Sequence, residues 1–311
     1  MNIIINKHLF AAYCGMLKSG YDLMDLSDTI VSNVHAWVST ADFGDEIPEY
    51  FLFTKTNTVS VNPYYPRGSD LSAACFIQDK RIDEYIDFLK TCKSPEANNP
   101  MFINWVSKLP PILQAIENHR EFKEIYQNYR KCLLTRFVHV SEQIAGIEKT
   151  LKSNPFNTPV SLIFAPNLLQ SKFLADYVLI DKLLYVISST FQSSSVIHEY
   201  LHLALKSAHQ LLIDIVMKYG LDRYVDVNKM LELGYLRGTT PADKAYVLDE
   251  LLVRALCGLL DTSINVPNYC YDNVQVGFHS IPQIIANLSI HSFSNLTLQE
   301  IVVQALNIIC H

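Results

Sequence analysis

The feature that most constrains this chain is the pattern His198-Glu199-Tyr200-Leu201-His202, which lies inside a strongly apolar helical segment. Residues four positions apart lie on one face of a helix, so His198 and His202 present two imidazoles to the same point. Two imidazoles and a carboxylate at the start of a buried helix are costly unless they are paired, and a metal ion would pair them. Glu199 directly follows the first histidine and is placed to act on water at such an ion.

The residues around this pattern predict a strand, a loop and a helix. Residues 183–189 are rich in β-branched and aromatic side chains, which is typical of a strand. Ser193, Ser194 and Ser195 offer an N-cap, and Gly220 is a plausible end for the helix. We therefore expect one apolar, buried helix to carry both histidines.

The order strand, loop and HExxH helix, with the local sequence Val-Ile-His-Glu-Tyr-Leu-His-Leu at 196–203, resembles the zincin metallopeptidases. The resemblance covers roughly residues 155–260. It implies an α+β, zincin-like fold, with a small mixed or antiparallel sheet over the active-site helix and a largely helical remainder. It also implies that an edge strand of that sheet pairs with an extended peptide substrate.

A catalytic zinc site usually has three protein ligands, so a third is expected. Metzincins use a histidine that follows a glycine, as HExxHxxGxxH, but this chain has Lys206, Ser207 and Ala208 before His209. On a continuous helix, His209 would lie two turns from His202, about 10 Å along the axis. We therefore predict no metal role for His209.

Gluzincins take their third ligand from a glutamate on a later helix, and Glu250 is the best candidate. Thr240 and Pro241 predict the start of that helix, and residues 246–256 continue it with an apolar pattern. The segment is similar to the glutamate-bearing helix of uncharacterised bacterial gluzincin-like proteins. Two alternatives stay open: Asp249 as the ligand, or no metal role, with Glu250 paired instead to Arg254 four residues on.

The predicted cofactor is Zn²⁺, held by His198, His202 and Glu250, with Glu199 as the general base. A tetrahedral oxyanion would need a second electrophile besides zinc. Tyr246 is one candidate, because it precedes Glu250 by one turn. Tyr235 and Arg237 are the others, because they lie in a loop between two glycines.

Composition excludes several other classes of protein. The net charge of −6 and the lack of a basic block argue against a nucleic-acid partner. No apolar run reaches the length of a membrane span, and no signal peptide is predicted. Seven cysteines, an odd number without CxxC spacing, favour reduced thiols in a cytoplasmic protein.

Along the chain, we expect a mostly helical region with a short β element at 1–152 and a zincin-like catalytic region at 153–311, or one continuous domain of both. Strands are predicted at 2–6, 160–166, 175–180 and 183–189, an extended stretch at 50–61, and a loop at 62–68. Helices are predicted at 8–17, 81–92, 101–107, 111–151, 281–290 and 298–309, with a break at Pro110 and Pro111.

The sequence therefore predicts a zinc metallopeptidase of the gluzincin type that acts on a peptide or protein substrate. Two alternatives remain. One is a binding or regulatory protein that keeps the zincin scaffold without turnover. The other is a zinc hydrolase of a non-peptide amide or ester. The oligomeric state is left open by the sequence.

Overall fold

The structure is a computed structural model that describes residues 2–52, 68–77, 85–87, 90, 98–152, 155–172, 174–288, 293 and 295–307. The helices of the first half are α1 (Lys7–Lys18), α2 (Thr29–Thr40), α3 (Glu46–Leu52), α4 (Gly68–Phe76), α6 (Pro100–Glu117), α7 (Phe122–Arg136) and α8 (Val140–Lys152). The strands are β1 (Ser161–Pro166), β2 (Ala175–Ile180) and β3 (Leu183–Ser188). The remaining elements are α9 (Ser193–Leu205), the 3₁₀ turn η2 (Lys206–Ala208), α10 (His209–Tyr219), α11 (Val227–Glu232), α12 (Pro241–Leu260), α13 (Val266–Gln275), α14 (Ile281–Asn287) and α16 (Leu298–Asn307).

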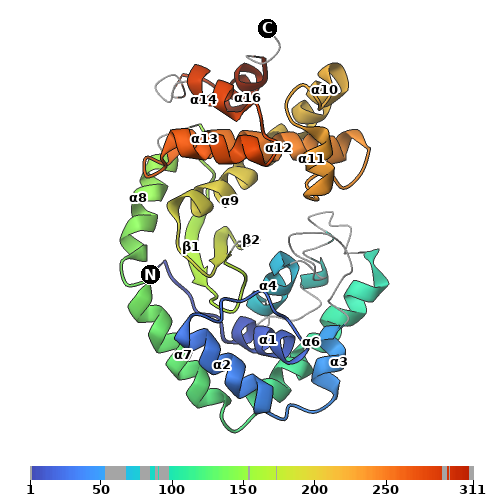
Figure 1. Cartoon of the computed structure of the whole chain (residues 1–311), viewed down its shortest axis with the longest axis vertical. Coiled ribbons are helices and arrows are strands. Elements are labelled where there is room, and N and C mark those ends of the chain that lie inside the picture. The colour runs from blue at the N-terminus through green and yellow to red at the C-terminus, as the bar shows by residue number, and fades with distance from the viewer. Residues whose placement is uncertain are drawn as a thin grey trace. The chain divides into compact units, whose positions relative to one another are not determined.

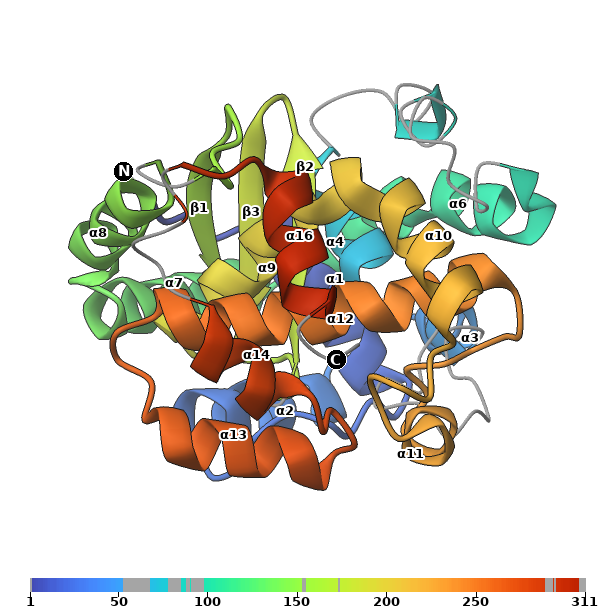
Figure 2. The same cartoon turned by 90° about the horizontal axis from the view of Figure 1, so that it is seen from above.

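The predicted α+β class is confirmed: the chain is mostly helical and carries a small three-stranded mixed sheet. The strand order is β1-β3-β2, as Figure 2 shows, and β2 and β3 form an antiparallel hairpin that ends at the pair Ile180 and Leu183. Asp181 and Lys182 make the turn with φ of 48° and 65°. Both residues are left-handed, as a two-residue hairpin of the favoured twist requires. The predicted N-terminal strand is reduced to a single parallel bridge between Ile3 and Phe164.

Contacts within the chain divide it into two compact units. The first unit holds the described residues up to Ser141 together with Leu162–Phe191, and so includes the sheet. The second unit holds Glu142–Ser161 together with the described residues from Gln192 onward. Both units are discontinuous in sequence. The predicted boundary after residue 152 and the predicted placement of the sheet over the HExxH helix stay predictions.

The first unit is built around α1. Every residue from Leu9 to Leu17 is buried, and α2, α3, α4 and α6 all pack against this helix (Figure 1). The helix starts where the Asn6 side chain accepts a hydrogen bond from the Leu9 N–H, which satisfies one of the free donors of the first turn. A helix buried on all sides is expected of an interior element.

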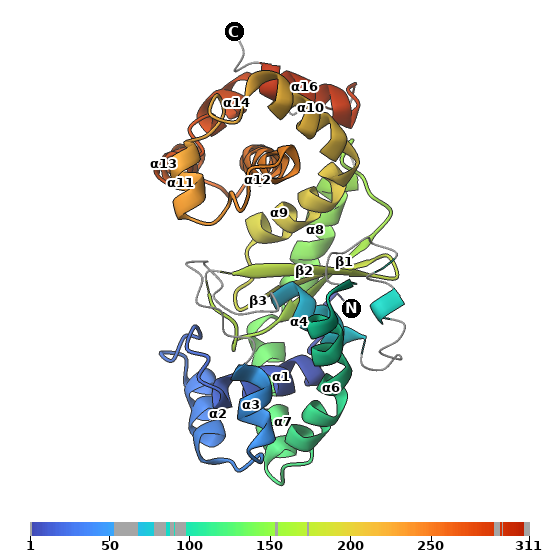
Figure 3. The ribbon, with the colours of Figure 1, turned by 90° about the vertical axis from the view of Figure 1, so that its right-hand side faces the viewer.

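The second unit is built around α12, which Figure 3 shows nearly end-on, with α9, α10, α11, α13, α14 and α16 around it. Of these, α9, α10 and α14 make the most extensive packing with α12. The start of α12 is fixed by a capping box, in which Thr240 and Asp243 satisfy each other's backbone N–H groups. The Cys257 thiol donates to the Ser194 carbonyl across 3.2 Å and ties the first turn of α9 to α12.

Several predicted elements need correction. Pro110 and Pro111 do not break the helix, because α6 runs through both. Each proline removes a hydrogen bond, but the helix keeps a continuous buried face of Phe102, Trp105, Val106, Leu109, Ile112, Leu113 and Ile116, and this burial outweighs the local cost.

The helix that carries the histidines is also shorter than predicted. Gln192 rather than a serine occupies its N-cap position, without a side-chain hydrogen bond, and the helix ends at Leu205, where η2 redirects the chain into α10. Because of this turn, both α9 and α10 pack against α12. The predicted end at Gly220 is confirmed as the end of α10, with φ of 80° at the glycine.

The predicted extended stretch at 50–61 is wrong where the structure describes it, because residues 50–52 belong to α3. Its remaining residues and most of the predicted helix at 81–92 lie outside the described residues. So does the predicted loop at 62–68, except for Gly68, which begins α4. Within the described part of the chain, no helix combines the length and apolar character that a membrane span needs. The described cysteines, Cys14, Cys75, Cys132, Cys257 and Cys270, are free thiols.

Candidate metal centre

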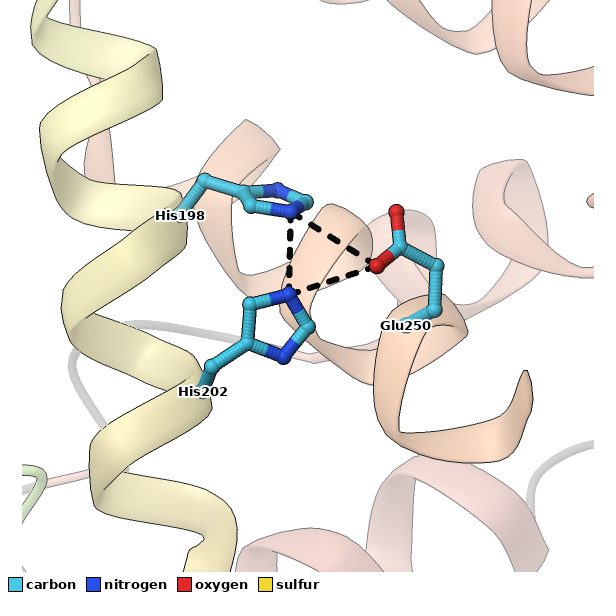
Figure 4. Close-up of side chains that lie close together, drawn as sticks. All are labelled: His198, His202 and Glu250. Carbon is cyan, nitrogen blue, oxygen red and sulfur yellow. Dashed lines mark hydrogen bonds and ion pairs between the residues drawn. The ribbon is translucent and has the colours of Figure 1, made fainter. Parts of the chain in front are cut away.

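The HExxH helix and the helix that bears Glu250 pack side by side in the second unit and bring three potential ligands together. His198 and His202 project from α9 and Glu250 from α12, and their side chains converge as Figure 4 shows. The two Nε2 atoms are 3.1 Å apart. Glu250 Oε2 lies 3.3 Å from His202 Nε2 and 3.6 Å from His198 Nε2.

Two of these three spacings fit the edges of a tetrahedral zinc site, and the third, 3.1 Å, is slightly shorter. Zinc lies about 2.0–2.2 Å from imidazole nitrogens and carboxylate oxygens, so two tetrahedral ligand atoms are about 3.3–3.6 Å apart. The donor set of two imidazoles and one carboxylate is also one that zinc accepts. The three ligands predicted from the sequence are therefore brought together with spacings that suit that ion.

Asp249 fixes the orientation of one imidazole. Its Oδ2 atom accepts a hydrogen bond of 2.6 Å from His202 Nδ1. With a proton held at Nδ1, the ring would present a lone pair at Nε2, on the side of His198 and Glu250, once a metal ion displaced the second proton. A carboxylate on the far nitrogen of a ligand histidine is the usual outer partner in metal sites, where it sets the tautomer and the ring orientation.

The electrostatics of the cluster favour one positive charge among these side chains. Burial opposes a charged imidazole, but the carboxylates of Asp249 and Glu250 raise the pKa of His202 to about 10. Burial lowers the pKa of His198, and His202 and Arg254 nearby add to that decrease. Although burial opposes its charged form, Glu250 has a pKa well below its usual range, because Arg254 and both histidines favour the carboxylate.

Arg254 occupies the other side of the Glu250 carboxylate. Its Nε donates to Glu250 Oε1 across 2.6 Å, which realises the pairing that the i, i+4 spacing predicted. Only 8% of the Glu250 side chain is exposed, so both oxygens need partners. One oxygen is satisfied by the guanidinium and the other is directed at the two imidazoles, so ion pairing and metal ligation do not exclude each other.

The roles of the remaining predicted site residues stay predictions. Glu199 is buried on α9, directly after His198. Tyr235 is in the second unit and its hydroxyl accepts from Arg254 Nη2 at 2.9 Å, which links it indirectly to Glu250. Tyr246 lies one turn before Glu250 and is 47% exposed. His209 begins α10 and is not part of the metal-ligand group found among the described residues.

Sequence reasoning missed the roles of Asp249 and Asn273 in this cluster. Asp249 was weighed only as an alternative ligand, although adjacent helix residues point about 100° apart. That spacing favours different partners for two neighbouring carboxylates. Asn273, whose Oδ1 accepts from Arg254 Nη1 at 2.9 Å, carried no such signal, because it lies on a separate helix.

Comparison of the chain with known protein families, curated proteins and solved structures found no match. The function must therefore be argued from the site itself.

Proposed function

We propose that this protein is a zinc-dependent hydrolase of the gluzincin type that cleaves peptide bonds. The observation that carries the proposal is the convergence of His198, His202 and Glu250, with donor atoms 3.1–3.6 Å apart. The hydrogen bond from His202 to Asp249 supports it, because that bond presents Nε2 to the other two groups. The neighbouring Glu199 adds the general base that hydrolysis needs.

Zinc in such a ligand set supplies Lewis-acid chemistry, making water acidic enough to attack near neutral pH and polarising the substrate carbonyl. In the proposed reaction, the Glu199 carboxylate accepts a proton from the attacking water and delivers it to the leaving amine. His198, His202 and Glu250 hold their donor atoms in place, so the site is organised before substrate arrives.

The test is metal content together with hydrolysis by the full chain. We expect one zinc per chain in the wild type and cleavage of members of a mixed peptide library. Glu199→Gln should keep the zinc and lose at least about 100-fold in rate, because general base catalysis contributes that much. A wild type that binds no zinc, even after incubation with the metal, would refute the proposal.

A second function is favoured by one observation, the close pair between Arg254 and Glu250. A carboxylate whose charge is already balanced by a guanidinium needs no metal ion for that purpose, so the second candidate is a zincin-scaffold protein that only binds a partner. In that case the wild type and Glu199→Gln would bind zinc equally, or not at all, and neither would hydrolyse peptides. Screening small amides and esters beside the peptides separates this outcome from a hydrolase of a different substrate class.

A further inference from the structure

The two oxygens of the Glu250 carboxylate have different environments. Oε1 accepts the 2.6 Å hydrogen bond from Arg254 Nε, while Oε2 faces the imidazoles of His198 and His202 at 3.6 and 3.3 Å. A glutamate side chain has freely rotating bonds, and nothing in its own chemistry chooses which oxygen meets a metal. Here the contact with Arg254 makes the two oxygens different.

Arg254 itself is held by groups from two other segments of the second unit. Its Nη1 donates to Asn273 Oδ1 on α13 and its Nη2 donates to the Tyr235 hydroxyl, each at 2.9 Å. The guanidinium carbon also lies 4.7 Å from the centre of the Phe278 ring, within cation–π range. The planar fork is therefore fixed along both of its edges and over an aromatic face.

The acceptor on α13 is fixed as well. Asn273 is 3% exposed, and its Nδ2 donates to the Tyr269 carbonyl at 2.8 Å, so its oxygen is the atom that faces Arg254. The Tyr269 hydroxyl in turn donates to the Arg254 carbonyl at 3.0 Å. These hydrogen bonds join α12 to α13 around Arg254, and Arg254 in turn contacts Glu250.

We propose that Arg254 is a positioning residue that fixes Glu250 as a one-oxygen metal ligand, with Tyr235 and Asn273 as its supports. This inference rests on the proposed function. It gives Tyr235 a role different from the electrophile that the sequence predicts, because the hydroxyl is engaged by Arg254. Outer partners that orient a metal ligand typically change metal affinity by about 10–100-fold when removed.

The direction of the effect separates positioning from simple charge. Arg254 is a cation near a site for a divalent cation, so by charge alone its removal should strengthen zinc binding. If it positions Glu250, its removal should weaken zinc binding, because the carboxylate loses its fixed orientation. We expect Arg254→Met to raise the zinc Kd about 10–100-fold. Arg254→Lys, which keeps the charge but lacks the fork, should be intermediate.

Tyr235→Phe separates support from catalysis. It removes only the hydroxyl and keeps the ring, whose centre lies 5.3 Å from that of Phe278. As a support of Arg254, it should weaken zinc binding by less than about 10-fold, and activity lost at limiting zinc should return at saturating zinc. A transition-state role would instead lower kcat about 100-fold or more at full zinc occupancy, with the zinc Kd unchanged.

The experiment measures the zinc Kd of the full chain by competition with a chromophoric chelator, with circular dichroism to verify folding. Arg223→Met, an exposed change in the same unit, is the matched control and should bind zinc as the wild type does. Val302→Ala, a buried truncation on α16, should lower the melting temperature and leave the zinc Kd unchanged. This second control separates a loss of general stability from a loss at the site.

The inference is overturned if Arg254→Met binds zinc as tightly as the wild type, or more tightly. If Arg254→Met fails to fold, Tyr235→Phe and Asn273→Leu take its place, and unchanged affinity in both overturns the inference. These results are distinct from failure of the proposed function, in which the wild type itself would bind no zinc or bind zinc without hydrolysis.

Discussion

Each unit of the molecule contains a glutamate beside histidine and a basic residue, half-buried at Glu117 and buried at Glu250, and the two clusters are built differently. In the first unit, Glu117 Oε1 accepts from His8 Nδ1 at 2.7 Å and Oε2 accepts from Lys7 at 2.6 Å, so both oxygens have a direct partner. In the second unit, only Oε1 of Glu250 has so short a contact, with Arg254. Oε2 lies 3.3 and 3.6 Å from two imidazole nitrogens.

This difference indicates which cluster is suited to a cation. The Glu117 cluster is complete, because each oxygen of the carboxylate has its own short contact, one with His8 and one with Lys7. The Glu250 cluster has three acceptor-capable atoms that point at one another, and three such atoms are stable together only around a proton or a metal ion. Residue types alone would not separate the two clusters, since each has a glutamate, a histidine and a basic side chain.

Removal of a histidine should affect zinc binding in one cluster and not in the other. We expect His202→Ala to weaken zinc binding by more than about 100-fold, because loss of a direct ligand exceeds the effect of losing an outer partner. His8→Ala should leave the zinc Kd unchanged. Isothermal titration with zinc measures both, and equal affinities in the two variants would contradict the contrast between the clusters.

The next largest effect concerns Asp249. Asp249→Asn should weaken zinc binding about 10–100-fold, because the neutral amide no longer holds the proton at Nδ1 of His202 by a charge-assisted bond. Asp272→Asn, on the exposed side of α13, is the matched control and should have no effect. Competition with a chelator provides the measurement. An unchanged Kd for Asp249→Asn would mean that His202 is oriented by packing alone.

Zinc should also stabilise the folded chain. At a free zinc concentration 100 times Kd, binding to the folded state adds about 2.7 kcal/mol to the free energy of unfolding. Chemical denaturation with zinc and with a chelator gives this difference directly, and His202→Ala should show less than about 0.4 kcal/mol of it at the same zinc concentration. Equal stabilisation of that variant would place the zinc elsewhere in the chain.

The Glu117 cluster should contribute through pH rather than through metal. Burial opposes the charged form, but His8 and Lys7 hold the pKa of Glu117 below its usual range. A carboxyl group whose pKa is lowered by folding adds stability above its unfolded pKa of about 4.3, and this stability is lost as the pH falls through the folded pKa. We expect Glu117→Gln to cost about 1–3 kcal/mol at pH 7, because a charge-assisted bond is lost.

As the pH falls from about 4.3 through the lower folded pKa, that difference between Glu117→Gln and the wild type should shrink, since the wild-type carboxyl is then progressively protonated. Urea denaturation across pH 3 to 7 measures it. A difference that stays constant with pH would mean that Glu117 acts by packing and not by charge.

Much of the local structure was predictable from short-range patterns. The hairpin of β2 and β3, the capped starts of α12 and α16, and the end of α10 at Gly220 all follow from residues within a few positions of each other. The errors arose where burial overrode a local signal, as at Pro110 and Pro111, or where packing interrupted a regular pattern, as at η2.

At the candidate site, the spacing of His198 and His202 was sufficient to place two imidazoles on one helix face, because helix geometry is the same wherever the helix packs. Glu250 was selected as the third ligand by its place on an apolar helix, with Asp249 and the pair with Arg254 left as alternatives. The contact of Asp249 with His202 and the contact of Arg254 with Asn273 depend on how α9, α12 and α13 pack. Side chains 47 residues apart are brought together by that packing, and no local pattern encodes it.

The amino-acid pattern alone therefore specifies the identity of the donor atoms and their periodicity, since both are properties of one helix. Tertiary packing decides which oxygen of Glu250 faces the histidines and which nitrogen of His202 faces Asp249. It also decides that both oxygens of Glu117 have a short contact with a neighbouring side chain. Those outcomes depend on differences of a few tenths of an ångström in the contact distances between side chains, which are fixed only when the core of each unit is formed.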